Sequence, residues 1–388
     1  MKRREFVKAA AVTPILAGVL GVARAAAAIR PSQGERAGFT FYSPVAEAWY
    51  RGGRFLEWTS TIRNDNGRRV KIFYRTFGDR SRPAIVILPG FPNSSFDYRE
   101  LISLLERDYF VAVLDFPGFG FSDKPADGYS YMLNDDARLT DHFIGKVLAL
   151  SRFSLYTHSR GVSVGLAFLT HFLDSERRQY EIAYHFISNS GMYLPLASLS
   201  EQQTAMLDPV RGPALIEQLR ATPRVTEGRP EQVAAADIEA FNDGTGARLN
   251  VGKYHLERAA NEERWLANLA KSPVPTALLW GLRETVNPFR IADYIWMKYL
   301  NDRDVESSFW LLPAAAHPPH RDLPEEVSRI VRLCLEGRIP APEAEDAFMT
   351  NLARNTRPTS PIYVGHSRVR AVSFPGAVVY TPDGYRVP

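Results

Sequence analysis

Hydrophobic positions along the chain follow two recurring patterns. Short runs that are largely apolar are typical of strands buried in a parallel sheet, and apolar residues three and four positions apart are typical of helices that cover it. The first pattern predicts strands over residues 54–62, 69–77, 84–88, 109–114, 153–156, 182–187, 276–281 and 308–312. The second predicts helices over residues 96–107, 133–150, 162–173 and 324–335. Because strands and helices alternate, we expect an α/β fold with a doubly wound, mostly parallel sheet.

The strand pattern is interrupted between residues 192 and 270. Four helices are predicted there, over residues 199–207, 212–220, 231–241 and 256–269. A helical insertion between two strands of such a sheet predicts a cap over its carboxyl edge, where ligands bind in open α/β sheets. Ordinary crossover helices are the alternative interpretation.

These patterns divide the chain into six segments. They are a signal peptide (residues 1–25), an N-terminal leader (26–53), the first part of the core (54–191), the helical cap (192–270), the second part of the core (271–337) and a C-terminal extension of unknown role (338–388). The extension is rich in Pro and Ala at its start, and no chemistry is assigned to it.

The first residues carry a targeting pattern. Lys2-Arg3-Arg4 precedes an apolar stretch over residues 9–22 and a small-x-small cleavage site at Ala23-Arg24-Ala25. This order predicts twin-arginine export to the periplasm or beyond. The apolar stretch is short and rich in Ala and Gly, so we expect no stable membrane anchor after cleavage.

Charge and cysteine content narrow the possible partners. The 388 residues carry a formal net charge of +4, and five basic residues against one acidic residue within positions 1–25 account for all of it. The mature chain is therefore neutral, which argues against a nucleic-acid or anionic-membrane partner and favours a small-molecule substrate. Cys334, the only cysteine, lies in an apolar helix pattern, and no Cys/His metal spacing occurs, so neither metal nor cofactor is expected.

The segment Thr157-His158-Ser159-Arg160-Gly161 carries the first sign of chemistry. It lies between a predicted strand and a predicted helix and has the layout of a nucleophile elbow, in which small residues flank a serine at two positions. Such a turn holds the serine in a strained conformation and exposes its hydroxyl. Thr157 departs from the usual Gly at the first small position.

A serine nucleophile needs a base, an acid that orients the base, and donors for the oxyanion. Glu284 follows the strand at residues 276–281 and is the candidate acid; His317 follows the last strand and is the candidate base. His320, three residues later, is the less favoured base. The backbone N–H groups of Phe91 and Arg160 are the candidate oxyanion donors.

Several loops in this order resemble those of the α/β-hydrolase superfamily. They are Leu88-Pro89-Gly90-Phe91-Pro92, Asp115-Phe116-Pro117-Gly118-Phe119-Gly120-Phe121-Ser122-Asp123, Trp280-Gly281 through Asn287-Pro288, and His317-Pro318-Pro319-His320. The resemblance covers residues 55–337 and is greatest to the capped branch of haloalkane dehalogenase-like and epoxide hydrolase-like proteins. It implies an α/β-hydrolase fold, in which Asp115 and Asp123 fix loops. Pro89 stands where the family usually has a supportive His.

The nucleophile position departs from this branch. Ser159 stands where those enzymes have Asp, and Arg160 stands where they have a halide-binding Trp. A serine ether could not be hydrolysed, so epoxide and haloalkane substrates are disfavoured, whereas serine suits attack on a carbonyl carbon. The expected function is cleavage of a carboxylic ester or lactone. Hydrolysis of a C–C bond in a β-diketone by the same triad and a catalytically silent binding protein are the alternatives.

Arg160 allows two interpretations. Its side chain either reaches solvent or a cap carboxylate, or it lines the pocket and contacts a substrate carboxylate. The second would resemble the Arg beside the nucleophile in dehalogenases that act on small haloacids. The sequence indicates neither the substrate nor the oligomeric state.

Overall fold

The structure is a computed structural model that describes residues 39–176, 179–338, 361–366, 380–381 and 384–385. The chain divides into two compact units, Met1–Glu35 and Arg36–Pro388, and every described residue belongs to the second. The expected signal peptide lies outside the described residues. Among those described, no helix has both the length and the apolar character that crossing a membrane would need.

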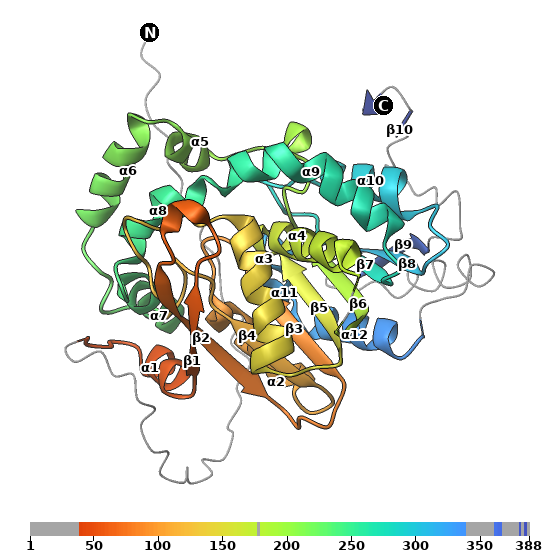
Figure 1. Ribbon diagram of the computed structural model, residues 1–388, viewed down its shortest axis with the longest axis horizontal. Helices are drawn as coiled ribbons and strands as arrows, with labels where there is room; N and C mark the ends of the chain where they lie inside the picture. The colour runs from red at the N-terminus through yellow and green to blue at the C-terminus, as the bar shows by residue number, and fades with distance from the viewer. Residues whose placement is uncertain (1–38, 177–178, 339–360, 367–379, 382–383, 386–388) are drawn as a thin grey trace. The chain divides into compact units, whose positions relative to one another are not determined.

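In the described part of the chain, nine strands form one sheet in the order β1-β2-β4-β3-β5-β6-β7-β8-β9 (Figure 1). Their bounds are β1 Arg54–Thr59, β2 Arg69–Phe77, β3 Ala84–Leu88, β4 Phe110–Leu114, β5 Arg152–His158, β6 Glu181–Ser188, β7 Thr276–Gly281, β8 Ser307–Leu312 and β9 Ile362–His366. Neighbours from β4 to β8 run parallel, while β1, β2 and β9 pair antiparallel. The mostly parallel α/β sheet predicted from the sequence is confirmed.

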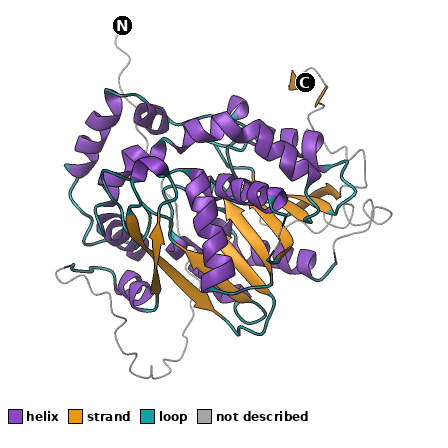
Figure 2. Ribbon diagram, in the orientation of Figure 1, coloured by secondary structure: helices purple, strands orange, loops and turns teal. Residues whose placement is uncertain are grey.

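Helices cover both faces of this sheet (Figure 2). Those outside the insertion are α1 Pro44–Arg51, α2 Arg99–Leu105, α3 Leu133–His142, α4 Arg160–Asp174, α10 Phe289–Ile295, α11 Pro319–Asp322 and α12 Pro324–Leu335. Side chains of β3 alternate between two apolar clusters because successive residues of a strand point to opposite faces. Val86 joins the cluster that holds the apolar side of α4, and Ile87 joins the one that holds α2 and α12.

The helices between β6 and β7 form an insertion, called here the inserted segment (residues 194–271). They are η4 Leu194–Leu196, α5 Glu201–Leu207, α6 Arg211–Arg220, α7 Pro230–Ala240, α8 Gly244–Gly252 and α9 Tyr254–Lys271. The four helices predicted here are present. The sequence did not predict α8, whose glycines weaken the helical signal and whose first turn depends on the Asp243 side chain accepting from the Gly246 N–H.

Part of the C-terminal extension joins the sheet. The sequence left residues 338–388 as an extension of unknown role, and in the structure β9, within it, pairs with β8 and forms one edge of the sheet. Tyr363 is fully buried, and its ring centroid lies 4.7 Å from that of Trp310. A five-residue strand gives little local signal, because its place depends on pairing with a distant strand. A separate ladder joins β10 (Tyr380–Thr381) to β11 (Gly384–Tyr385).

Candidate active site

The turn from β5 into α4 holds Ser159 in a strained conformation. Its φ of 54° and ψ of −121° lie in a region that non-glycine residues rarely adopt. A Cβ at Gly161 would lie 2.2 Å from the Leu88 carbonyl oxygen, and one at Gly90 would lie 2.5 Å from the Ser159 Cβ. Glycine at both positions therefore lets the end of β3 pack directly against the elbow, as the nucleophile-elbow interpretation requires.

The tertiary structure accounts for Thr157. Its hydroxyl donates to the Phe186 carbonyl oxygen at 3.1 Å and lies 3.0 Å from His185 Nε2. A hydroxyl group has only one proton, and Thr157 donates it to the Phe186 carbonyl. The hydroxyl oxygen therefore accepts from His185, whose Nε2 carries the proton. Burial lowers the pKa of His185 to about 3, which keeps its ring neutral. A Cβ at Gly165 would lie 2.7 Å from Thr157 Cγ2, so this glycine leaves the room that the larger side chain occupies.

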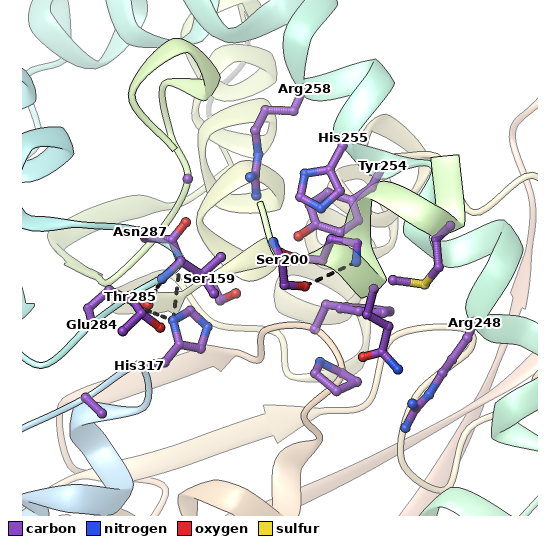
Figure 3. Close-up of a pocket in the computed structure, with 18 of the residues that line it drawn as sticks. Ser159, Ser200, Arg248, Tyr254, His255, Arg258, Glu284, Thr285, Asn287 and His317 are labelled. Carbon is purple, nitrogen blue, oxygen red and sulfur yellow. Dashed lines mark hydrogen bonds and ion pairs between the residues drawn. The ribbon is translucent and has the colours of Figure 1, made fainter. Parts of the chain in front are cut away.

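The candidate base and acid contact each other, as predicted. Glu284 follows β7 and His317 follows β8, adjacent parallel strands whose carboxyl ends lie at the same sheet edge. His317 Nδ1 donates to Glu284 Oε2 in a very short hydrogen bond (Figure 3). The Glu284 side chain is 1% exposed, whereas that of His317 is 28% exposed. The contact fixes Nδ1 as the protonated nitrogen and leaves Nε2 as the one available to act as a base.

Two asparagines that the sequence analysis missed support the acid. Asn189 Nδ2 donates to Glu284 Oε2 at 3.4 Å, while the backbone oxygen of Asn189 accepts from the Ser159 N–H at 3.0 Å. Asn287 Nδ2 lies 3.5 Å from the same carboxylate oxygen. Asn189 therefore connects the elbow to the acid loop. Asn287 lies within the loop from Trp280 to Pro288 that resembles the family's, but it was given no role; no motif marks Asn189, because it reaches Glu284 from the end of a separate strand.

The pKa of Glu284 is lowered from its ordinary value. Burial alone would raise it, but the hydrogen bond and the charge of His317, together with the backbone N–H groups of Asn287 and Val286, outweigh burial. Val286 N–H donates to Glu284 Oε1 at 2.7 Å. The carboxylate is thus held ionised beside His317.

Ser159, Glu284 and His317 line one cavity of about 300 Å³. The inserted segment supplies much of the remaining wall, including Met206 of α5, Arg248 of α8 and the start of α9. Within the described chain, no hydrogen bond joins Ser159 Oγ to His317. Catalytic hydrogen bonds are commonly long without substrate and tighten when it binds.

The two candidate oxyanion donors belong to residues next to the elbow. Phe91 directly follows Gly90, which lies against the serine, and Phe91 lines the cavity. Arg160 is the first residue of α4, so its N–H has no carbonyl partner within the helix. The positive end of the helix dipole points to the same place. This arrangement suits an oxyanion that forms when Ser159 attacks a carbonyl.

The side chain of Arg160 does not contact the cavity. It is fully buried, and its Nη2 pairs with Asp136 Oδ2 of α3 at 2.5 Å. Its guanidinium also lies 5.1 Å from the centroid of the Phe119 ring. The predicted contact of Arg160 with a substrate carboxylate is therefore wrong. The ion pair instead holds α3 against the elbow, because a buried arginine requires a carboxylate partner.

His320 is excluded as the base by its position. It is fully buried and stacks on Tyr98 with 3.9 Å between ring centroids. His158 is likewise buried, and its ring packs 4.7 Å from that of His317. Burial lowers the pKa of both His158 and His320, so both rings are neutral. Both are therefore uncharged packing groups, and the ring of His158 contacts those of His317 and His320.

Other polar residues singled out in the sequence have structural contacts. Asp115 is fully buried and accepts from the N–H groups of Ser95 and Phe121 at 2.6 and 2.8 Å. Asp123 accepts from the Lys71 N–H at 2.8 Å. Both fix loops, as the resemblance implied.

Cys334 is buried, and burial raises the pKa of its thiol to about 12. The described residues contain no His, Cys, Asp or Glu group suited to hold a metal ion.

A cluster on α9 was also missed by the sequence analysis. Tyr254, His255 and Arg258 begin this helix and line the cavity opposite the triad (Figure 3). His255 stacks on Tyr254 with 4.1 Å between ring centroids, and burial lowers the pKa of His255 to about 3. The predicted helix started at residue 256, so Tyr254 and His255 were assigned to no element, and Arg258 was assigned to the helix without a role.

A family model described as the alpha/beta hydrolase family matches residues 85–330. The putative hydrolase LipZ of Mycobacterium tuberculosis is 26% identical over 294 residues, which cover 73% of this chain and 95% of the relative. The alignment thus extends over nearly the full length of that protein.

Solved structures share the fold at low identity. A loop variant of a haloalkane dehalogenase from Bradyrhizobium elkanii superposes with a TM-score of 0.58 at 18% identity, covering 76% of this chain and 99% of that one. A thermophilic esterase from Thermogutta terrifontis gives a TM-score of 0.53 at 19% identity, covering 73% and 98%. These likenesses extend to the architecture only.

Proposed function

The chain belongs to the alpha/beta hydrolase family and is a hydrolase, and on that premise we propose that it cleaves a carboxylic ester or lactone through a Ser-His-Glu acyl-enzyme mechanism. One observation carries this proposal. Ser159, strained at the start of α4, shares a cavity with His317, whose Nδ1 is bound by the buried Glu284. These features support the roles of nucleophile for Ser159, base for His317 and orienting acid for Glu284.

The proposed reaction proceeds in two half-reactions. His317 Nε2 takes the proton of Ser159 as Oγ attacks the carbonyl carbon, and the N–H groups of Phe91 and Arg160 stabilise the oxyanion. The C–O bond to the alcohol breaks, and His317 returns the proton to the leaving oxygen. Water, deprotonated by His317, then attacks the acyl-enzyme and releases the acid. Glu284 stabilises the imidazolium that forms in both halves.

The side chain at position 159 selects carbonyl chemistry. Attack by a serine on an alkyl carbon would form an ether, which water does not cleave, whereas attack on a carbonyl forms an ester, which it does. The likeness to a haloalkane dehalogenase structure therefore concerns the architecture and not the reaction.

A fluorophosphonate probe tests the nucleophile. We expect the probe to label the wild-type chain at Ser159, and Ser159→Ala to abolish both labelling and p-nitrophenyl ester hydrolysis. Ser200→Ala is the matched control, because Ser200 lines the same cavity but caps α5. Labelling that survives Ser159→Ala would contradict the proposal. Faster turnover of β-diketones than of esters would show that the triad serves C–C bond cleavage instead.

We further propose that the chain is exported by the twin-arginine route, on the strength of Lys2-Arg3-Arg4 and the apolar stretch after it. Cell fractionation of the full chain and of an Arg3→Lys/Arg4→Lys variant tests this. The wild type should accumulate outside the cytoplasm and the variant inside it. Equal distribution of the two would contradict export by this route.

A further inference from the structure

The wall of the active-site cavity carries an excess of positive charge. Its charged residues are Arg248, Arg258, Arg283 and Glu284. Glu284 is bound to His317, and Arg248 Nε lies 3.0 Å from Glu239 Oε1. Arg283 is exposed at the rim. Arg258 is thus the one deeply buried arginine of this wall, at 2% exposure.

The Arg258 guanidinium is held in place from one side. Its Nε donates to Ser163 Oγ at 2.8 Å, and its Cζ lies 4.8 Å from the centroid of the Tyr254 ring. Ser163 of α4 lies four residues after Ser159, the N-cap of that helix, which is about one helical turn or about 6 Å along the axis. The guanidinium is therefore fixed near the nucleophile. Figure 3 shows Arg258 extending from α9 into the pocket that Ser159 lines.

The outer nitrogens of this guanidinium lack a carboxylate. Within the described chain, no Asp or Glu oxygen lies within ion-pair distance of Arg258, and its buried Nη2 has no hydrogen-bond partner. Tyr254 and, to a smaller extent, Glu262 act favourably on the charge of Arg258, but Tyr254 is a neutral phenol and Glu262 Oε2 accepts from the Leu194 N–H at 2.9 Å. Burial lowers the pKa of Arg258, which is the cost of desolvating an incompletely paired cation.

A Cβ at Gly191 would lie 2.7 Å from Arg258 Nη1 and 2.9 Å from Asn287 Oδ1. The absence of a side chain at position 191 therefore lets the guanidinium approach the loop that holds Asn287 and the acid. Arg258, from the inserted helix α9, and the Glu284–His317 pair, from the sheet edge, thus line the same cavity.

We infer that Arg258 binds a carboxylate on the substrate, so that the ester or lactone cleaved at Ser159 is anionic. A guanidinium whose Nε is already anchored presents its outer N–H groups in a fixed plane, the geometry that a carboxylate accepts. The carboxylate would satisfy the unpartnered Nη2 and offset the charge of Arg258. This inference rests on the proposed esterase function for the reacting bond but places the recognition group on residues outside the triad.

The inference is tested with two esters that differ by one charge. Mono-p-nitrophenyl glutarate carries a terminal carboxylate, and p-nitrophenyl valerate does not. We expect the wild type to prefer the anionic ester in kcat/KM by roughly 10- to 100-fold, the range expected of a charge-assisted hydrogen bond. Arg258→Gln should abolish the preference by raising KM for the anionic ester while leaving the neutral ester nearly unchanged.

Arg283→Gln is the matched control. It removes the same charge from the rim of the same cavity, so long-range attraction alone would fall equally in both variants. The preference should persist in Arg283→Gln, apart from a small effect that added salt removes. Equal loss in the two variants, or an equal loss of both esters in Arg258→Gln, would overturn the inference.

Two further measurements keep the result decisive. Arg258→Lys retains the cation if Arg258→Gln does not fold, and it should keep part of the preference because lysine supplies charge without the planar fork.

Calorimetric binding of glutarate to Ser159→Ala separates recognition from catalysis. If neither ester is hydrolysed, the esterase proposal fails, while glutarate binding that Arg258→Gln abolishes still supports the carboxylate site. If glutarate binds neither to Ser159→Ala nor to the variant that also carries Arg258→Gln, the carboxylate site is refuted.

Discussion

The orientation of His317 depends on one buried carboxylate. Glu284 accepts the Nδ1 proton of His317 and is itself held by the Val286 N–H at 2.7 Å. Glutamine at this position has nearly the same size, but its amide can place a donor against Nδ1 and so favour the wrong tautomer. We expect Glu284→Gln to lower kcat roughly 10³- to 10⁴-fold with little change in KM, measured by steady-state ester hydrolysis. Unchanged kcat would show that the acid lies elsewhere.

The same residue gives a pH dependence of stability. Its pKa in the folded chain is lowered from the ordinary 4.5. A depressed acid pKa contributes stability that is present above the unfolded pKa and lost as the pH falls through the folded one. Urea unfolding should therefore show wild type more stable than Glu284→Gln near neutral pH, and the difference should shrink as the pH falls below about 4.5. A difference that stays constant over this range would contradict the assignment.

A second buried charge acts on structure only. Arg160 pairs with Asp136, and both side chains are almost inaccessible. Removing either partner would leave an uncompensated buried charge, which typically costs about 3–5 kcal/mol. The pair therefore explains why an arginine can follow the nucleophile without facing the cavity.

At the scale of elements, strand β5 and helix α4 meet with little free space. A Cβ at Gly165 would lie 2.7 Å from Thr157 Cγ2. We expect Gly165→Ala to destabilise the fold by about 1–3 kcal/mol, because neither backbone can retreat from this contact. Thr157→Ser keeps the hydroxyl that contacts His185 and Phe186 but removes the methyl group.

A double-mutant cycle in urea unfolding measures this contact. Thr157→Ser should be mild alone and should recover part of the loss caused by Gly165→Ala, with a coupling free energy of about 0.5–3 kcal/mol. Additive effects would show that the threonine methyl group and the helix do not compete for the same space. The position before the elbow would then tolerate threonine for another reason.

The inserted segment forms much of the wall of the cavity. Its helices supply Arg248, Arg258 and Tyr254, while Ser159, Glu284 and His317 come from the sheet edge. On the proposed function, reaction and recognition would reside on separate elements, so substitutions in α9 should change substrate choice without moving Ser159 or His317.

At the scale of the whole molecule, β9 closes one edge of the sheet. Its backbone pairs with β8, and Tyr363 is fully buried. A chain that ends after residue 338 should lose at least about 3 kcal/mol of stability, since deleting a buried aromatic side chain alone costs that much. It should also associate through the exposed edge of β8. Urea unfolding and light scattering measure the two effects.

A chain that ends after residue 366 is the control for this truncation. It retains β9 and lacks only the segment beyond it. We expect it to remain monodisperse relative to the shorter chain and to keep the stability that β9 contributes. Equal behaviour of the two truncated chains would show that β9 is dispensable for the core.

Local pattern was sufficient for the elements whose character is set by neighbouring residues. The strands β2, β3 and β7 and the helix α12 begin and end where the sequence predicts, because an alternating strand, two largely apolar strands and a strongly amphipathic helix each give a clear local pattern. The order Ser159, Glu284, His317 was also evident, since each residue lies in the loop after a predicted strand. The contact between His317 and Glu284 agrees with that expectation.

Tertiary structure decided the features that depend on residues far apart in the chain. In the folded chain β9 pairs with β8, the Arg160 side chain forms an ion pair with Asp136, and Arg258 donates a hydrogen bond to Ser163. Burial and charge pairing settle such choices, and neither is visible in a local run of residues. The sequence by itself thus determined the sheet and the candidate nucleophile Ser159, because both depend on local runs of residues, whereas the packing of the inserted helices determined which charged side chains line the cavity.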